Sequence, residues 1–133
     1  MQYNYSQKLL LDSKIAHEIK DWATYIIPEW VGGVNGSNIR TPYYHMQNGE
    51  KVIACDEWEP TNNTEQAFQL MIDFDLLGSN IGYLMAAGVE VEDKYPIKDD
   101  PHSLARLAIC EAALACNYRI QKTLEKHEYD YAY

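Results

Sequence analysis

Residues 100–120 read DPHSLARLAICEAALACNYRI, and this stretch decides the fold. Asp100 is a residue type that caps helices, and Pro101 is preorganised for the first helical position. From residue 104 to residue 120, apolar side chains occur on nearly every side of the helical wheel. Because a helix that is apolar all round is buried all round, we expect it to pack against both a sheet and another helix or subunit.

The residues before this helix predict an N-terminal helix followed by a hairpin. Apolar residues spaced by four and three indicate a helix over residues 7–26 that ends before Pro28; they are Leu11, Ile15, Ile19, Trp22 and Ile26. Residues 31–38 form a loop rich in Gly, Asn and Ser. Asn48-Gly49 supplies the two positive-φ residues of a type I′ turn, which predicts a hairpin of residues 41–47 and 50–55.

The middle of the chain predicts a second helix and a second hairpin. Asn63 is suited to cap a helix that Gly78 ends, with Gln66 placed to reach back to the cap. Residues 81–85 and 89–92 resemble two strands joined by a short turn. This order of elements predicts an α+β fold, a layered α-β-α sandwich with an antiparallel sheet, an N-terminal helix and a long C-terminal helix. We expect one domain over residues 1–133, with a loose or interface-forming tail over 125–133.

Composition excludes several classes of protein. The 133 residues carry a net charge of −9, which argues against binding a nucleic-acid backbone or an anionic membrane surface. Since no run of eighteen apolar residues occurs and residues 1–13 do not resemble a secretory signal, we expect a soluble protein. Three cysteines without metal-ligand spacing (Cys55, Cys110 and Cys116) are typical of a reducing, cytoplasmic compartment.

Three segments of the chain resemble the phage ABA-sandwich domain family. Residues 15–22, IAHEIKDW, resemble its first-helix motif, in which a small-residue helix ends at a tryptophan. Residues 60–67, PTNNTEQA, resemble its proline and capped turn at the entry to a helix. Residues 107–114, LAICEAAL, resemble its closing helix.

The resemblance implies a phage origin, an α-β-α layered domain and a place in the host cell cytoplasm. The same broad group includes the Thoeris anti-defence sponges. These phage proteins bind signals of the cyclic ADP-ribose type, some also cyclic oligonucleotides, without cleaving them. Because such sponges are oligomers, the resemblance also implies a homo-oligomer that silences host immunity by binding alone.

The residue inventory argues against catalysis. Catalysis requires a nucleophile or a general acid–base beside an orienting partner. The sequence has no HExxH, GxSxG, CxxC or phosphate-loop motif, and the histidines are dispersed along it: His17, His45, His102 and His127. Residues 55–57 offer metal ligands, but no second cluster completes a site. We therefore predict that the protein is not an enzyme and uses no metal or cofactor.

Aromatic and basic residues provide the elements of a site for a nucleotide-type ligand. Bases stack on aromatic rings, and phosphates require donors such as arginine and helix N-termini. Sixteen residues are aromatic, eleven of them tyrosine. The candidate ligand-binding residues are Arg106, Arg40, Tyr83, Tyr43, Tyr44, Trp58 and Asn62.

The candidate residues have alternative interpretations, which the sequence leaves open. Arg106 stands at the start of the last helix, where the helix amides favour a phosphate, yet it could instead pair with Asp99, Glu111 or a neighbouring subunit's carboxylate. The aromatic residues either face a ligand or pack in the core and in interfaces. We assign Trp22 and Trp30 to packing.

An acidic inhibitor of a host defence protein is the competing function. Surface carboxylates imitate phosphates, so a contiguous acidic face would occupy a basic channel, as in an anti-CRISPR-like protein. The candidate clusters are Asp56, Glu57 and Glu59, and Glu90, Glu92 and Asp93. Because short charge runs are typical of solvated surfaces, we rank ligand sequestration first, the inhibitor second and a structural phage role third.

Overall fold

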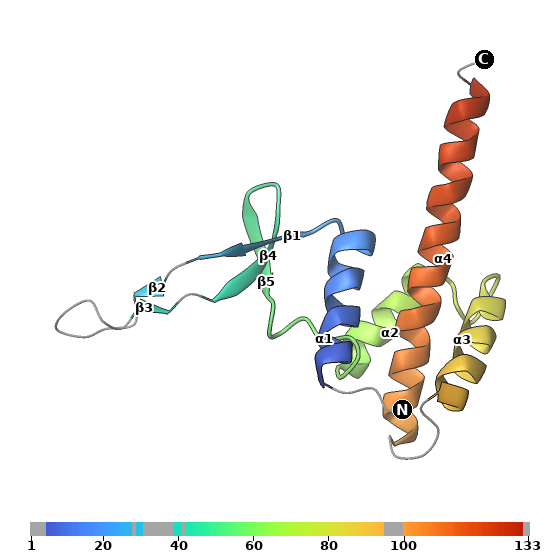
Figure 1. The fold of residues 1–133 in the computed structure, drawn as a ribbon, viewed down its shortest axis with the longest axis horizontal. Helices are drawn as coiled ribbons and strands as arrows, with labels where there is room; N and C mark the ends of the chain where they lie inside the picture. The colour runs from blue at the N-terminus through green and yellow to red at the C-terminus, as the bar shows by residue number, and fades with distance from the viewer. Residues whose placement is uncertain (1–4, 28, 31–38, 41, 95–99, 132–133) are drawn as a thin grey trace.

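The computed structural model describes residues 5–27, 29–30, 39–40, 42–94 and 100–131. Its elements in chain order are α1 (Tyr5–Lys14), η1 (Ile15–Ile19), β1 (Ala23–Ile26), β2 (Glu29–Trp30), β3 (Ile39–Arg40), β4 (Tyr43–Gln47), β5 (Glu50–Ala54), α2 (Thr64–Asp73), α3 (Ile81–Lys94) and α4 (Pro101–Tyr131). Figure 1 shows the helices and the antiparallel strands. The predicted α+β class, with an N-terminal helix and a long C-terminal helix, is confirmed.

The N-terminal helix ends earlier than its apolar stripe predicts. α1 continues into η1, a π-helical turn in which the Lys20 amide donates to the Ile15 carbonyl at 3.2 Å. Asp21 then has a φ of 57°, a left-handed conformation of the kind that terminates helices. The prediction of helix as far as Ile26 is therefore wrong. The residues of β1 include β-branched and aromatic side chains, which favour a strand.

The predicted hairpin around Asn48-Gly49 is confirmed. The two turn residues have φ values of 54° and 81°, and they join β4 to β5. β1 pairs with the other edge of β4, which gives an antiparallel sheet in the order β1-β4-β5, while β2 and β3 form a separate two-stranded ribbon. The predicted loop over residues 31–38 lies outside the described residues.

The predicted cap of α2 is also confirmed. Asn63 Oδ1 accepts a hydrogen bond of 3.0 Å from the Gln66 amide. The Gln66 side chain does not return to the cap residue as expected. Instead, its Oε1 accepts from the Glu59 amide at 2.8 Å and its Nε2 donates to the Glu57 carbonyl at 2.9 Å. These bonds tie the loop before α2 to the helix.

α3 occupies the residues for which the sequence predicts a second hairpin, so that prediction is wrong. A short apolar run fits both a strand and a helix, and periodicity alone does not separate them. Leu84, Met85 and Ala86 are strong helix formers. Ala87 and Val91, which are four residues apart, form the buried side of the helix.

α4 is the helix against which the other helices pack. Asp100 Oδ1 accepts a hydrogen bond of 2.8 Å from the Ser103 amide, so the predicted cap is confirmed. Buried residues of α4 form the main core with α1, η1, α2, α3 and Trp58; those of α4 are Leu107, Cys110 and Ala113. The helix continues beyond this core to Tyr131 (Figure 1), whereas the sequence predicts a loose or interface-forming tail from residue 125.

The sheet lies to one side of the helices (Figure 1). It meets the helical core through partly buried residues such as Trp22, before β1, and Ile53 of β5. The layering thus differs from the expected placement of helices on both faces of the sheet, because the residues expected to form a second hairpin join the helices instead. No helix within the described ranges has the length and apolar character needed to cross a membrane.

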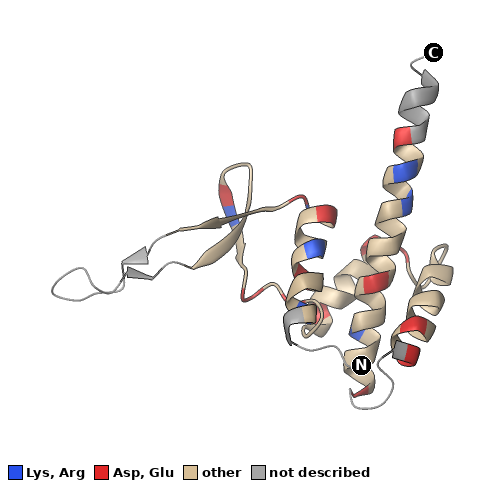
Figure 2. Ribbon diagram, in the orientation of Figure 1, with Lys and Arg blue, Asp and Glu red and all other residues tan. Residues whose placement is uncertain are grey.

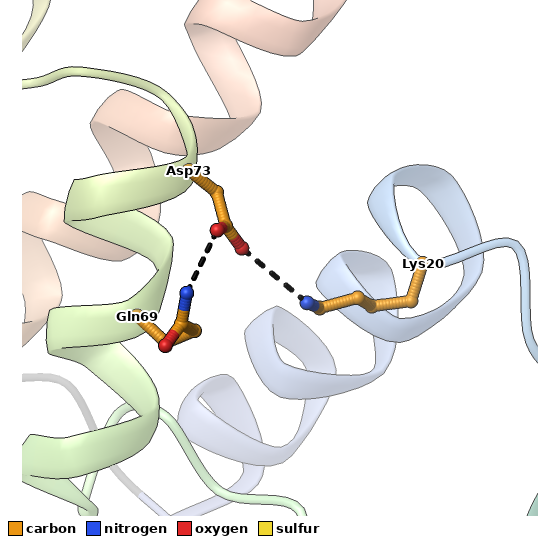
Figure 3. Close-up of polar contacts among 3 residues, drawn as sticks. All are labelled: Lys20, Gln69 and Asp73. Atoms are coloured by element: carbon orange, nitrogen blue, oxygen red, sulfur yellow. Dashed lines mark hydrogen bonds and ion pairs between the residues drawn. The ribbon is translucent and has the colours of Figure 1, made fainter.

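An ion pair connects the N-terminal helical segment to α2 (Figure 3). Lys20 Nζ lies 3.7 Å from Asp73 Oδ2, and Gln69 Nε2 donates to Asp73 Oδ1 at 2.8 Å. Because both charged side chains are partly exposed to solvent, this pair contributes about 0.5 kcal/mol or less. Burial of the apolar core therefore dominates the packing of these helices.

Candidate functional site

A cavity of about 390 Å³ lies between α1, the open end of the β4–β5 hairpin and the loop before α2. Its volume is at the lower end of the range for small-molecule sites. Three predicted ligand-binding residues line it, although they come from separate parts of the chain: Tyr43, Trp58 and Asn62. The other lining residues are Lys8, Leu9, Asp12, Pro42, Cys55, Asp56 and Glu59.

Asp12 is the buried carboxyl group of the cavity, with an exposed fraction of 3%. Its Oδ1 accepts from the Thr61 amide at 3.0 Å, and its Oδ2 accepts from the Thr61 hydroxyl at 2.9 Å. Burial raises the pKa of Asp12 to about 6, although the hydrogen bonds from Thr61 oppose the shift. This carboxyl group therefore changes its charge close to neutral pH.

Trp58 forms a fixed wall of the cavity. It is 7% exposed, and its Nε1 donates to the Asp12 carbonyl at 3.0 Å. Its ring packs edge-to-face on Trp22, with ring centroids 5.0 Å apart. Since the indole is held on several sides, Trp58 offers an edge to a ligand and no free stacking face.

Tyr43 and Lys8 supply the stacking ring and the cation of the cavity. The Tyr43 side chain is 56% exposed, so its ring is available for stacking. Lys8 Nζ donates to Asn62 Oδ1 at 3.5 Å and to Ser103 Oγ at 3.3 Å. The ammonium group thus lies beside the first turn of α4, where the Ser103 amide is already bonded to Asp100.

The lining of the cavity is acidic on balance. Asp12, Asp56 and Glu59 contribute three carboxyl groups, and Lys8 is the single lysine or arginine among the lining residues that the structure describes. A ligand with a phosphate must therefore place it toward Lys8 and Asn62. Hydrogen-bond donors of the ligand are favoured at Asp56 and Glu59.

Arg106, the predicted phosphate donor, supports the loop before α2. Its Nε donates to the Thr61 carbonyl at 3.0 Å, and its Nη1 donates to the Thr64 hydroxyl at 3.1 Å. It is not among the described residues that line the cavity, and these two bonds go to a backbone carbonyl and a hydroxyl. Asp99, one of its alternative partners, lies outside the described residues. By holding Thr61, Arg106 positions the partner of Asp12.

Of the remaining predicted residues, the structure places Tyr44 and Tyr83 away from this cavity. Tyr44 lies on β4 with Lys51 Nζ 4.5 Å from the centre of its ring. Tyr83 lines a separate groove of about 280 Å³ that also contains Arg119. Arg40 belongs to β3, and its side chain is outside the part that the structure describes.

Two histidines that the sequence presents as dispersed lie together in the fold. His17 Nε2 is 2.8 Å from Thr24 Oγ1, and His45 Nδ1 is 3.3 Å from the same oxygen. The two imidazole rings have centroids 6.0 Å apart. Burial, with a further contribution from His17, lowers the pKa of His45. The pairing of Thr24 with His45 across β1 and β4 creates this cluster, which the wrong helix prediction concealed.

The cysteines show no sign of an activated thiol. Burial is the main cause that raises the pKa of all three thiol groups, and no disulfide joins them. Within the described residues, no cluster of three or more His, Cys, Asp or Glu side chains could hold a metal ion.

Comparisons of the chain with protein-family models, with curated proteins and with solved structures gave no match.

Proposed function

We propose that the protein is a phage anti-defence protein that binds a compact nucleotide-type signal, of the cyclic ADP-ribose class, and sequesters it without cleavage. One observation carries this proposal. Tyr43, Trp58 and Asn62 were each predicted from the sequence as ligand contacts, and they line one cavity together with Lys8. The cavity combines an aromatic ring, hydrogen-bond acceptors and a cation, which are the groups that a nucleotide requires.

Each part of such a ligand has a complementary group in the cavity. The base stacks on the exposed ring of Tyr43, and its exocyclic amino group donates to Asp56 or Glu59. The phosphate contacts Lys8 and the Asn62 amide.

The volume favours compact signals. A cavity of about 390 Å³ is near the lower limit for small-molecule sites, so cyclic di- and trinucleotides would extend into solvent. We therefore rank a cyclic ADP-ribose-type signal above the cyclic oligonucleotides.

The first experiment is a thermal-shift panel of the purified full-length chain against cyclic ADP-ribose isomers and cyclic di- and trinucleotides. A ligand at a hundredfold its dissociation constant adds about 2.7 kcal/mol to the free energy of unfolding, which raises the melting temperature. Bound ligand should be recovered intact after denaturation. If the protein is folded and free of ligand, and no compound raises its melting temperature, the proposal is contradicted. Recovery of a cleaved product would contradict sequestration.

Variants of two lining residues test whether the ligand occupies this cavity. Tyr43→Ala and Lys8→Ala should each weaken binding at least tenfold, since one removes the stacking ring and the other the cation. Tyr118→Ala is the matched control, because Tyr118 is a similarly exposed tyrosine on α4 and is not among the residues that line the cavity. Equal losses in the three variants would place the ligand elsewhere.

Arg106→Ala distinguishes the phosphate contact that the sequence predicts from the support of the loop before α2 that the structure shows. If Arg106 holds the loop before α2, its replacement should lower the free energy of unfolding by about 1–2 kcal/mol. If it binds phosphate instead, stability should not change while affinity is lost. Urea denaturation without ligand distinguishes the two results.

The acidic inhibitor remains the alternative of second rank. Figure 2 shows the carboxylates on separate elements, among them the loop after β5, which holds Asp56 and Glu57, and the end of α3, which holds Glu90 and Glu92. A pull-down from host extract that recovers a defence protein, together with a flat ligand panel, would favour this alternative.

A further inference from the structure

The sheet contacts the helical part of the chain at a cluster of three polar side chains, which we name the histidine junction. It consists of His17 of η1, Thr24 of β1 and His45 of β4. The Thr24 hydroxyl oxygen lies 2.8 Å from His17 Nε2 and 3.3 Å from His45 Nδ1. His45 is only 4% exposed, whereas His17 and Thr24 are exposed to solvent. Since the sheet lies to one side of the helices (Figure 1), the junction lies at the boundary between the two.

One hydroxyl serves both imidazole rings, which limits the number of protons that the junction can hold. While both rings are neutral, the Thr24 hydroxyl can donate to one ring and accept an N–H from the other. One imidazolium is also accommodated, because it donates to the hydroxyl, whose own proton then goes to the neutral ring. A second imidazolium leaves that proton without a ring nitrogen to accept it. It also places two positive charges on rings whose centroids are 6.0 Å apart, where they repel each other.

No negative group compensates for a second charge in the junction. Among the described residues, no carboxylate forms an ion pair with either histidine. Burial and, after it, the charge of His17 lower the pKa of His45. Tyr25 and Lys51 accompany Tyr44 on the opposite face of the sheet. The other titratable residues of the segments around His45 are Glu18 of η1, Lys20 and Asp21 before β1, Glu50 of β5, and Cys55 after it.

We propose that the histidine junction is a pH-sensitive device that holds the sheet against the helices while at most one histidine is charged, and releases the sheet when both are protonated. A detached histidine has an ordinary pKa of 6.5, and the held form lowers the pKa of His45. The held form therefore loses stability as the pH falls below 6.5. Since His17 is exposed, its proton enters without any opening of the fold. The inference does not depend on the proposed ligand, because all three groups belong to the free chain.

Release of the sheet would reach the cavity through a series of ring contacts. His45 packs on Trp22 with ring centroids 5.5 Å apart, and Trp22 packs on Trp58 at 5.0 Å. Trp58 forms one wall of the cavity, and Tyr43, two residues before His45 on β4, lines it from the sheet. When the sheet moves away, the cavity loses Tyr43, and Trp58 loses the support of Trp22. We therefore expect the cavity to open in acid.

Proton NMR of the full-length chain without ligand, from pH 8 to pH 4.5, tests the junction. In the wild type, the nuclear Overhauser contacts between the Trp22 and His45 rings should disappear as the pH falls below 6.5. In His17→Gln, which carries no charge, these contacts should persist and the pKa of His45 should rise. His102→Gln is the matched control, since His102 is an exposed histidine at the start of α4, and it should behave as the wild type does. Contacts that survive full protonation of both histidines in the wild type, or that disappear at the same pH in His17→Gln, would overturn the proposal.

Two further measurements separate release of the sheet from other acid transitions. Asp12 changes its charge near pH 6, so the titration is repeated in Asp12→Asn, where the contacts should disappear as in the wild type. If they persist there, Asp12 and not the junction causes the transition. Far-UV circular dichroism should retain the helical signal throughout, because the core of the helices is apolar. Loss of the helical signal at the same pH would show general unfolding and would contradict release of the sheet alone.

Discussion

Asp12 connects α1 to the loop before α2, because the same residue bonds to both Trp58 and Thr61. Its carboxyl oxygens accept both hydrogen bonds from Thr61, and its backbone carbonyl accepts the Trp58 indole N–H. In the sequence it stands beside Ser13 and Lys14, which is typical of a solvated helix face. Its partners are more than forty residues away, so local pattern could not identify it. Lys8 escaped prediction for the same reason.

The raised pKa of Asp12 makes stability depend on pH. The pKa is about 6 in the folded chain and 3.8 without the protein environment. A raised pKa in the folded state stabilises the fold at low pH, and this contribution is lost as the pH rises through 6. Asp12→Asn retains the shape and an oxygen acceptor, but it does not ionise. Its stability relative to the wild type should therefore increase by about 1–3 kcal/mol between pH 4 and pH 7.5.

Urea denaturation of both proteins at several pH values measures this difference. Comparing the variant with the wild type removes the contributions of the other titrating groups, which both proteins share. A constant difference across the pH range would contradict the raised pKa of Asp12.

Elements with local signals could be predicted from the sequence, and elements without them could not. The β4–β5 turn and the caps at Asn63 and Asp100 depend on residues within three positions of one another. By contrast, β1 exists because it pairs with β4, about twenty residues further along the chain. The sequence of α3 fits two strands as well as it fits a helix, and packing against the rest of the chain decides that it forms a helix.

Replacing glycine by alanine should change the free energy of unfolding in opposite directions in the hairpin turn and in α3. Gly49 has a φ of 81°, so Gly49→Ala should lower the free energy of unfolding by about 1–2 kcal/mol. Gly82 lies in a helix with open space around it, so Gly82→Ala should raise it by about 0.5–1 kcal/mol. Urea denaturation of both variants and the wild type measures these changes. A loss of stability in both variants would contradict the open environment of Gly82.

The candidate site was predicted in part because its aromatic and amide members belong to recognisable local elements. Tyr43 lies in the predicted hairpin, Trp58 follows it, and Asn62 precedes the predicted helix cap. Arg106 was assigned from its position at a helix start, but its guanidinium bonds to Thr61 and Thr64 instead. Which face a side chain takes depends on how the helices pack, and no local pattern contains that information.

Across the whole molecule, the net charge of −9 opposes the approach of any anionic ligand. The cavity adds carboxylates of its own, and Lys8 provides attraction only at short range. Long-range repulsion is screened by salt, with a Debye length of about 10 Å at 0.1 M, whereas a contact with Lys8 inside the cavity is screened less. Salt should therefore affect binding in the direction opposite to that of a basic nucleotide-binding protein.

We expect the association constant of a phosphate-bearing ligand to rise by up to about tenfold between about 0.01 M and about 0.15 M ionic strength. An uncharged nucleoside, which has no charge for the protein to repel, should show no such rise. Titration calorimetry of both ligands at several salt concentrations measures the effect. If binding weakened as salt increased, attraction to a local basic site would dominate, and the ligand would have to contact groups other than the acidic cavity beside Lys8.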